Sequence, residues 1–507
     1  MTTACSRWHR AGSGGCGTRW RHAGRCGTAW ASQASSVSAS LHRMSPTCST
    51  CGSITPTRDI AGRYPCKSRC ARAGWGRGPG ARSLRWVGDH KHRARAVSNV
   101  DAEDSRSIGR RLREIRAWRG MTQKAVAELA GFTEGYLSRI EHGQCPVERR
   151  STLEAFAAAL RVAPSELAEQ AFPPAAADPV TGEAQATVTA LEVALSDLDL
   201  GAPLDETARP WPAVAADMDR LNTELRPATD YAAQGLVLPG LLRELHTLYV
   251  IDREHRPDVL RALIDCYHAA GIMLKNLGVR GLPALAAIHA RRVAEELEDP
   301  AWFGLVAWLR ASTIGSAGRP RMLDLSVQGA DALAAHLDDS RCRQMYGALH
   351  LNAALASAAM RRPADAAAHL GEASGIADAL PEGPNRHGFG SLYFGPDNVG
   401  IWRVSIEVEL GDPGRARELA RGVHPSEVPS AARQGMFWAD LGRGLATQRG
   451  TRDDAVAALL RAEKIAPQRI RPNPFVRETV TDLMQRARRD AGGRELRGMA
   501  HWMGIAG

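Results

Sequence analysis

Four cysteines near the start of the chain have a spacing that suits a metal site. Two residues separate Cys48 from Cys51, and three separate Cys66 from Cys70. Two close pairs of thiolates can supply the tetrahedral shell that zinc prefers. The strand-forming residues and turn glycines that a zinc ribbon usually has between its pairs are sparse in this segment. A metal site is therefore the least favoured interpretation of this segment, and we expect no cofactor.

Residues 1–97, which contain these cysteines, have an unusual composition. They include no Glu and no Phe. They contain 17 Lys and Arg residues but only two acids, Asp59 and Asp89. With so few aliphatic side chains they cannot bury enough surface to offset the entropy of the chain. Three interpretations remain: a metal site, a disordered basic tail, and an extension translated from a misplaced start codon. The composition favours the last, and a start point near Val97 or Val100 would suit the onset of order.

The rest of the chain has no group of residues typical of an enzyme. It has no Walker-type phosphate loop, and Gly388-x-Gly390 lacks the third glycine and the preceding strand of a dinucleotide site. No two histidines after residue 97 lie three or four apart, which excludes the helical zinc-hydrolase pairs. Cys145, Cys266 and Cys342 are isolated, as buried thiols commonly are. We therefore expect a protein that is not an enzyme.

Length and composition indicate several domains or one repeat array in these 507 residues. Apolar residues make up 44% and charged residues 24%, which allows a sizeable core. The formal net charge of +10 arises in residues 1–97, because the remainder has 48 Lys and Arg against 53 Asp and Glu. Bulk charge is therefore poor evidence for nucleic-acid binding. No long apolar run or secretory leader pattern occurs, so we expect a cytoplasmic protein with no membrane partner.

Residues 105–170 have the pattern of a compact five-helix domain. Thr122 and Thr133 suit the N-caps of its second and third helices, Gly131 suits the turn between them, and Gly143 ends the third. The expected helices cover residues 105 to about 120, 123–130, 134 to about 142, 149–160 and a short turn from 164 to 167.

A helix-turn-helix pattern lies within this domain. Counted from Gln123, such a motif needs a small fifth residue, a glycine at the ninth, and apolar residues at the fourth, eighth, tenth, fifteenth and eighteenth positions. The chain meets all seven requirements with Ala127, Gly131, Val126, Ala130, Phe132, Leu137 and Ile140. The segment from Met121 to Gly143 closely resembles the Xre-type, or phage-repressor, helix-turn-helix family. An ordinary helical bundle is the alternative, but residues 105–162 carry 11 Lys and Arg against six Glu, which suits a phosphate-facing surface.

The resemblance implies which side chains read DNA. In the family the third helix lies in the major groove, with its N-terminal side chains at base edges. Carried over by position, the base-reading residues are Thr133, Glu134, Ser138 and Arg139. Arg139 suits a bidentate contact with guanine, and Glu134 suits the amino group of cytosine. The alternative for Arg139 is a surface ion pair with Glu141 or another neighbour.

Further residues are expected to position the domain on phosphates. Gln123, with Thr122 before it, resembles the family residue that binds phosphate and braces the recognition helix. Arg149 and Arg150 suit phosphate contacts beyond it, and Tyr136 suits either a sugar–phosphate contact or packing. A single recognition helix spans few base pairs, so the resemblance also implies a homodimer on a two-fold site of double-stranded DNA.

The C-terminal two-thirds of the chain is predicted to be an α-solenoid, which makes the fold class all-α. After a linker at 171–182, helical spacing continues through 183–507 without alternating strands. Antiparallel helix pairs are expected between breaks near Pro257, Gly278, Pro300, Gly318, Pro363, Pro413 and Gly450. The segment from Trp438 to Pro467 resembles a tetratricopeptide repeat, and weaker copies precede it at irregular spacing. The repeats are therefore degenerate.

A solenoid has a concave groove, and such grooves bind peptides or proteins. The predicted loop at 381–397 interrupts the repeats and contains or adjoins Arg386, His387, Phe389, Tyr393, Phe394 and Asn398. This loop either binds an effector or packs its own aromatic residues against the array. We favour packing.

The combination of head and body resembles transcriptional regulators of high-GC Gram-positive bacteria, which implies a peptide, protein or other effector. The alternative is a protein-interaction scaffold whose head does not read bases. Glu134 would repel phosphate and Gly135 has no side chain, so both residues keep this alternative open.

Overall fold

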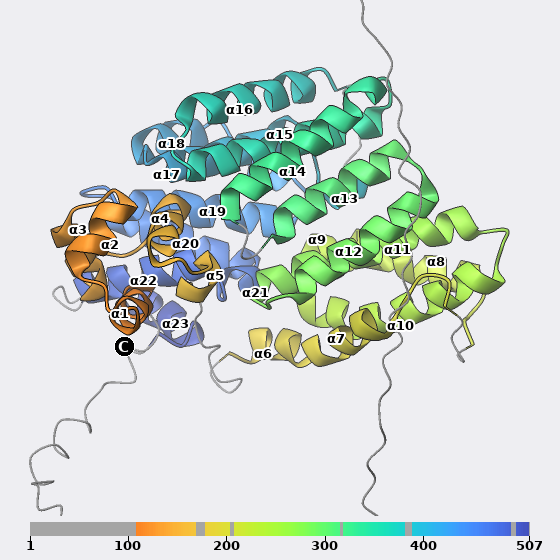
Figure 1. Ribbon diagram of the computed structural model, residues 1–507, viewed down its shortest axis with the longest axis horizontal. Helices are drawn as coiled ribbons and strands as arrows, with labels where there is room; N and C mark the ends of the chain where they lie inside the picture. Colours follow the sequence, from red (N-terminus) through yellow and green to blue (C-terminus); the bar gives the residue numbers. More distant parts are fainter. Residues whose placement is uncertain are drawn as a thin grey trace, which may run out of the picture. The chain divides into compact units, whose positions relative to one another are not determined.

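The computed structural model describes helices and turns, and no strand, in six ranges of the chain (Figure 1). All of them belong to one compact unit, 88–507. The described ranges are 108–168, 178–202, 207–314, 318–380, 388–487 and 493–505. The four cysteines considered above for a metal site, Cys48, Cys51, Cys66 and Cys70, lie outside them. None of the described helices is long and apolar enough to span a membrane.

Residues 108–168 form the head, a bundle of five helices in the predicted order. The helices are α1 (Ile108–Trp118), α2 (Gln123–Ala130), α3 (Glu134–Glu141), α4 (Arg150–Leu160) and α5 (Pro164–Leu167). The Thr122 hydroxyl accepts a hydrogen bond from the N–H of Ala125 (3.1 Å), and that of Thr133 accepts one from Tyr136 (3.3 Å). Gly131 adopts the left-handed conformation with φ 72°, which a side chain would strain. Both predicted caps and the predicted turn are confirmed.

The first half of the body consists of long antiparallel helices. They are α6 (Pro179–Ala186), α7 (Val188–Asp197), α8 (Trp211–Arg220), a π turn (Leu221–Leu225), α9 (Arg226–Ala228), α10 (Tyr231–Ile251), α11 (Arg256–Asn276), α12 (Leu282–Leu297), α13 (Pro300–Thr313) and α14 (Gly318–Leu333). The prolines that were expected to break the chain stand in the first turns of α11 and α13, where a missing N–H costs nothing.

The second half continues the array. It contains α15 (Ser340–Ala359), α16 (Pro363–Asp378), α17 (Pro396–Leu410), α18 (Pro413–Ala420), α19 (Ala431–Ala446), α20 (Arg452–Ile465), α21 (Pro467–Ile470), α22 (Pro474–Ala487) and α23 (Arg494–Trp502), with 3₁₀ turns at Ala334–His336, Phe389–Ser391 and Pro425–Glu427. All seven predicted breaks are present. The break between α14 and α15 was not predicted, because no proline or glycine marks it; Asp339 caps the new helix there.

The body stacks its helices in two layers, as a solenoid does. Each helix from α10 to α16 packs against its successor, and α11, α13, α15, α17 and α19 also contact one another in order. These odd-numbered helices therefore form a continuous inner layer. Figure 1 shows the head helices, in orange, beside α19 and α22 of the body, in blue, and both of these helices contact the head.

The predicted linker at 171–182 is wrong in its last five residues. Asp178 caps α6, and Pro179 stands in the first turn of that helix. The Asp178 carboxylate is 1% exposed and lies 2.6 Å from Nη1 of Arg471, 293 residues further along the chain. A proline-rich segment indicates a linker only when no distant partner fixes it. Residues 171–177 lie outside the described ranges.

Candidate nucleic-acid interface and ligand cavity

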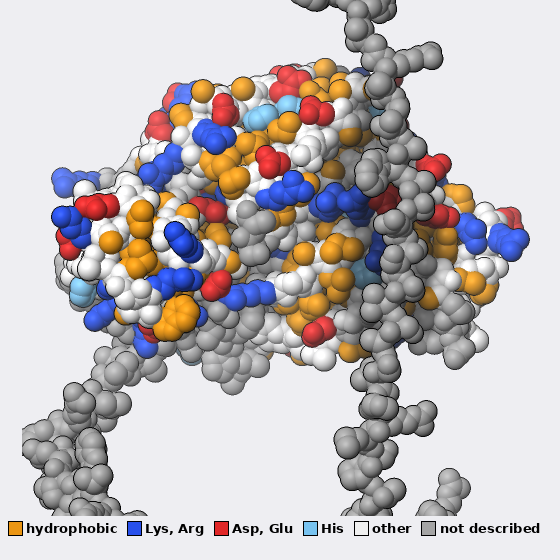
Figure 2. Space-filling view, viewed as in Figure 1, with side chains coloured by type: hydrophobic (Ala, Val, Ile, Leu, Met, Phe, Trp, Pro, Cys, Tyr) orange, Lys and Arg blue, Asp and Glu red, His pale blue; other side chains and the backbone are white. Residues whose placement is uncertain are grey.

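The predicted base-reading side chains lie together on the outer face of the head. Thr133, Glu134 and Arg139 are exposed, and Ser138 is half-buried. Among the described residues Arg139 forms no ion pair, and Glu141 pairs with Arg116 instead, so the alternative of a surface pair between Arg139 and Glu141 is not observed. Figure 2 shows Lys and Arg side chains spread over the head. The face of α3 thus presents one cation and several hydrogen-bonding groups to solvent.

A buried carboxylate fixes this face in position. Glu141, at the end of α3, has a side chain with 0% exposure and accepts two hydrogen bonds from Arg116 of α1, at 2.5 and 2.8 Å. Gln123 Nε2, at the start of α2, donates to the same carboxylate at 2.7 Å. The hydrogen bond to Glu141 raises the pKa of Arg116 above its ordinary value. Gln123 therefore braces α3 as expected, whereas its phosphate contact stays a prediction.

Packing accounts for the ring of Tyr136. This residue is half-buried, and its ring centroid lies 5.1 Å from that of Phe132. Burial raises the pKa of its phenol. The Thr122 hydroxyl is occupied as a helix cap. The packing interpretation of Tyr136 therefore fits, and any contact with the sugar–phosphate backbone would use the edge that remains exposed.

The two basic residues at the start of α4 face the body. Arg150 Nη1 lies 2.6 Å from Oε1 of Glu409 in α17, and the Arg150 N–H donates to Oε2 of the same carboxylate at 2.8 Å. The Arg150 side chain is only 14% exposed. Its expected role in phosphate binding is therefore corrected, because Glu409 neutralises its charge. Arg149 is half-buried beside Gly411 and forms no ion pair among the described residues, so its phosphate contact stays a prediction.

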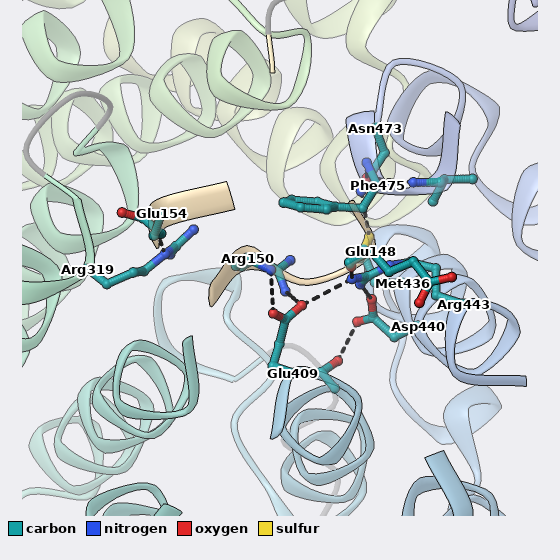
Figure 3. Close-up of polar contacts among 12 residues, drawn as sticks. Glu148, Arg150, Glu154, Arg319, Glu409, Met436, Asp440, Arg443, Asn473 and Phe475 are labelled. Atoms are coloured by element: carbon teal, nitrogen blue, oxygen red, sulfur yellow. Dashed lines mark hydrogen bonds and ion pairs between the residues drawn. The ribbon is translucent and has the colours of Figure 1, made fainter. Parts of the chain in front are cut away.

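The head is held to the body by a buried polar network (Figure 3). Arg443 of α19, 1% exposed, pairs with Glu409 at 3.1 Å and with Asp440 at 2.6 Å, and donates a hydrogen bond to the carbonyl oxygen of Glu148 in the head. The network thus joins residues 148–150 of the head to α17 and α19 of the body. Its charged members are Glu409, Asp440, Arg150 and Arg443. Such a network holds its parts in one arrangement, because breaking any pair leaves a buried charge.

Apolar and terminal contacts extend the attachment. Phe475, at the start of α22, is buried in the hydrophobic core of the head, and the guanidinium groups of Arg150 and Arg443 lie 5.2 and 5.0 Å from its ring centroid. The N–H of Ile108 at the start of α1 donates to Glu478 at 2.7 Å. Burial raises the pKa of Glu478 and of Glu148 to about 7. Sequence reasoning missed this docking, because its partners lie hundreds of residues apart.

A cavity of about 1060 Å³ lies on the inner layer of the body. Helices α11, α13, α15, α17 and α19 form its floor, and α4 and α5 of the head contribute a wall through Leu153, Glu154 and residues 163–166. Its apolar lining includes Ile272, Trp308, Leu351, Leu355, Trp402 and Met436. The head therefore forms part of the boundary of the cavity through α4 and α5, which follow the helix-turn-helix.

The predicted effector loop is partly a packed wall of this cavity. The Phe389 ring lies edge-on to Trp302 with centroids 5.1 Å apart, and Phe394 fills the space that a side chain at position 347 would need. Asn398 is buried and donates to the carbonyl oxygen of Tyr393 at 3.1 Å. These aromatics thus pack against the array, while Tyr393, Phe394 and Asn398 also line the cavity. Arg386 and His387 lie outside the described residues.

Three cations in the cavity were not singled out from the sequence. Lys275, Arg433 and Arg469 come from α11, α19 and α21, and among the described residues none of them forms an ion pair. Lys275 is accessible because it faces the cavity, but enclosure by protein, and then the charge of Arg469, lower its pKa to about 7. Burial likewise lowers the pKa of Arg433 to about 10. No sequence motif joins residues so far apart.

Comparison with known proteins identifies the head. Residues 107–170 match the family model described as a helix-turn-helix domain. No curated protein matches the chain. The solved structure of Bacillus thuringiensis PlcR in complex with the peptide PapR7 and DNA aligns at 14% identity over 67% of this chain and 96% of that chain, with a TM-score of 0.20. The chain therefore carries a helix-turn-helix domain at 107–170. The described residues that follow it form the solenoid-like array of helices given above.

Proposed function

We propose that this protein is a sequence-specific DNA-binding regulator of transcription, of the Xre type. The observation that carries the proposal is the division of surfaces on the head. The back of the bundle, from α1 and α4, is fixed to the body through Glu478 and Glu409, while the face with Thr133, Glu134 and Arg139 points to solvent. A recognition helix needs this arrangement, since only side chains on an open face can reach base edges in the major groove.

A homodimer is the second part of the proposal. One α3 covers few base pairs, and two copies related by a two-fold axis would read both halves of a palindromic site. We infer a cytoplasmic regulator similar to those of high-GC Gram-positive bacteria, with domain limits near 105–170 for the head and near 178 for the start of the body.

The third part is an effector, a peptide, protein or small molecule, that binds the cavity of the body. The cavity supports this role because it is large and combines apolar surface with polar and charged side chains. Leu153 and Glu154 of the head form part of its wall, so a bound effector would contact both the body and the DNA-binding unit. Differential contact of this kind is what couples two sites.

Selection of random DNA duplexes by the purified full-length chain tests the proposal. The winning duplex and a scrambled control are then compared at two salt concentrations, because basic surfaces bind any DNA at low salt. We expect a two-fold motif preferred by about 10³ or more at physiological salt. A chain that enriches no motif, with or without ligand in the cavity, would instead be a protein-interaction scaffold, an alternative that the exposed acid Glu134 favours.

A further inference from the structure

The cavity contains both paired and unpaired basic side chains. Arg150, Arg226 and Arg319 line it, and each has an acidic partner: Glu409 at 2.6 Å, Asp265 at 3.4 Å and Glu154 at 3.4 Å. The three cations defined above, Lys275, Arg433 and Arg469, have no such partner among the described residues. Their like charges repel one another. An enclosed charge without a counter-charge is costly unless a ligand supplies one.

The acidic residues of the lining do not balance these three cations. Asp440 pairs with Arg443 at 2.6 Å and accepts a hydrogen bond from Ser405. Glu154 pairs with Arg319, and Glu166 accepts a hydrogen bond from the N–H of Ala163. The described lining as a whole contains seven Lys and Arg side chains against three acids, which leaves it with an excess of positive charge.

Arg433 is held ready for a ligand by its neighbours. Its Nε donates to Oδ1 of Asn398 at 2.8 Å, and its guanidinium lies 4.7 Å from the ring centroid of Trp402. Its Nη2 is buried and makes no hydrogen bond to another described residue. A guanidinium that is fixed on one side and unpartnered on the other suits a planar or tetrahedral anion.

Two further polar residues of the lining have a hydroxyl without a described partner and a strained backbone. Thr229 and Tyr393 are 4% and 9% exposed, and neither hydroxyl makes a hydrogen bond to another described residue. Their φ angles, 60° and 54°, lie in the left-handed region, where a β-branched residue such as Thr229 is an outlier. Ser391, also in the lining, has φ 55°. Strain of this kind concentrates at ligand sites.

We propose that this cavity binds a small amphipathic organic anion, whose carboxylate or phosphate is held by Lys275, Arg433 and Arg469 and whose apolar part contacts apolar lining residues such as Ile272, Leu351 and Leu355. The volume of about 1060 Å³ is at the upper end of small-molecule sites, about 300–1,000 Å³. The inference deepens the effector part of the proposed function and rests on it. Its test contains no DNA, so its failure and a failure of base reading are distinguishable.

Isothermal titration of the full-length chain with four eight-carbon probes tests the inference. Octanoate and octyl phosphate carry the two candidate anions, octan-1-ol is neutral, and octylammonium is cationic. We expect at least one anion to bind about tenfold or more tightly than the alcohol, as a charged hydrogen bond provides, and the cation to bind less tightly than the alcohol. The stronger of the two anions identifies the head group. Equal affinity for anionic, neutral and cationic probes would overturn the proposal.

Matched variants separate binding from folding. Lys275→Met is expected to lower anion affinity about tenfold and leave the alcohol unaffected, while Lys464→Met, on the exposed side of α20, changes neither. Because the charge of Lys275 is repelled by the neighbouring arginines, its removal is expected to keep or raise the melting temperature of the ligand-free chain. A lower melting temperature together with unchanged anion preference would show a structural lysine and overturn the proposal.

Discussion

At the scale of single residues, Glu141 joins α3 to α1 and α2 through Arg116 and Gln123. Replacing it with Ala removes the partner of Arg116 and Gln123 inside the head, and breaking a buried ion pair costs about 3–5 kcal/mol. We expect Glu141→Ala to lower the local opening free energy of α3 by that order. Hydrogen exchange of the α3 amides measures the change.

The matched control for this variant is Glu128→Ala in α2. Glu128 is 67% exposed and lies 4.0 Å from Lys124, so its loss is expected to cost less than about 1 kcal/mol. Similar exchange rates in the two variants would contradict the role given to Glu141.

Residue types and spacing predicted the caps and the core of the head, since both depend on neighbours within a few positions. Thr122, Thr133 and Gly131 satisfy local backbone geometry, which the sequence records directly. The partners of Glu141 and Arg150 lie on other elements, and no spacing rule identifies them. The interpretation of Arg150 as a phosphate contact failed for that reason.

At the scale of elements, the start of α1 is attached to α22 through a carboxylate whose pKa burial raises to about 7. A raised folded-state pKa means that the folded chain binds more protons than the unfolded chain between about pH 4.5 and 7. The stability contributed by Glu478 is thus fully present at the acidic end and is lost as pH rises through 7. Asp482, which faces the same group, adds to the raised pKa.

We therefore expect the melting temperature of the wild type, relative to Glu478→Gln, to fall as pH increases from 5.5 to 7.5. The glutamine keeps an oxygen acceptor for the Ile108 N–H but does not titrate. Thermal unfolding of both chains across this range measures the difference. A difference that is constant with pH would contradict the raised pKa.

Helix boundaries in the body were predictable where Pro or Gly marks them, as at Pro300 and Gly278. They were not predictable where a distant partner sets them. Asp178 begins α6 because Arg471 neutralises it, and Asp339 begins α15 by capping its N-terminus. The cavity has the same property: its lining comes from helices that share no motif, so only the fold brings the lining residues together.

At the scale of the whole molecule, Arg443 links head and body. Replacing it with Ala leaves Glu409 and Asp440 with less compensation and removes the hydrogen bond to Glu148. We expect the protection of the α4 amides to fall by about 3–5 kcal/mol and anion affinity to fall with it, since the head forms a wall of the cavity. Hydrogen exchange and titration with the stronger-binding anionic probe measure the two effects.

The control for this variant is Arg415→Ala, which removes an exposed ion pair with Glu418 in α18. It is expected to leave both α4 protection and anion affinity unchanged. Loss of α4 protection without any loss of anion affinity would show that the head does not contribute to the cavity.

The central claim, that the outer face of α3 reads bases, is tested most directly by repeating the duplex selection with Arg139→Ala. We predict that this variant loses preference at one position in each half-site, at a cost of about 1–3 kcal/mol, and keeps the rest of the motif. Arg149→Ala should weaken all sequences alike and reduce the salt dependence. An unchanged motif for Arg139→Ala, with affinity reduced equally for every sequence, would contradict the account.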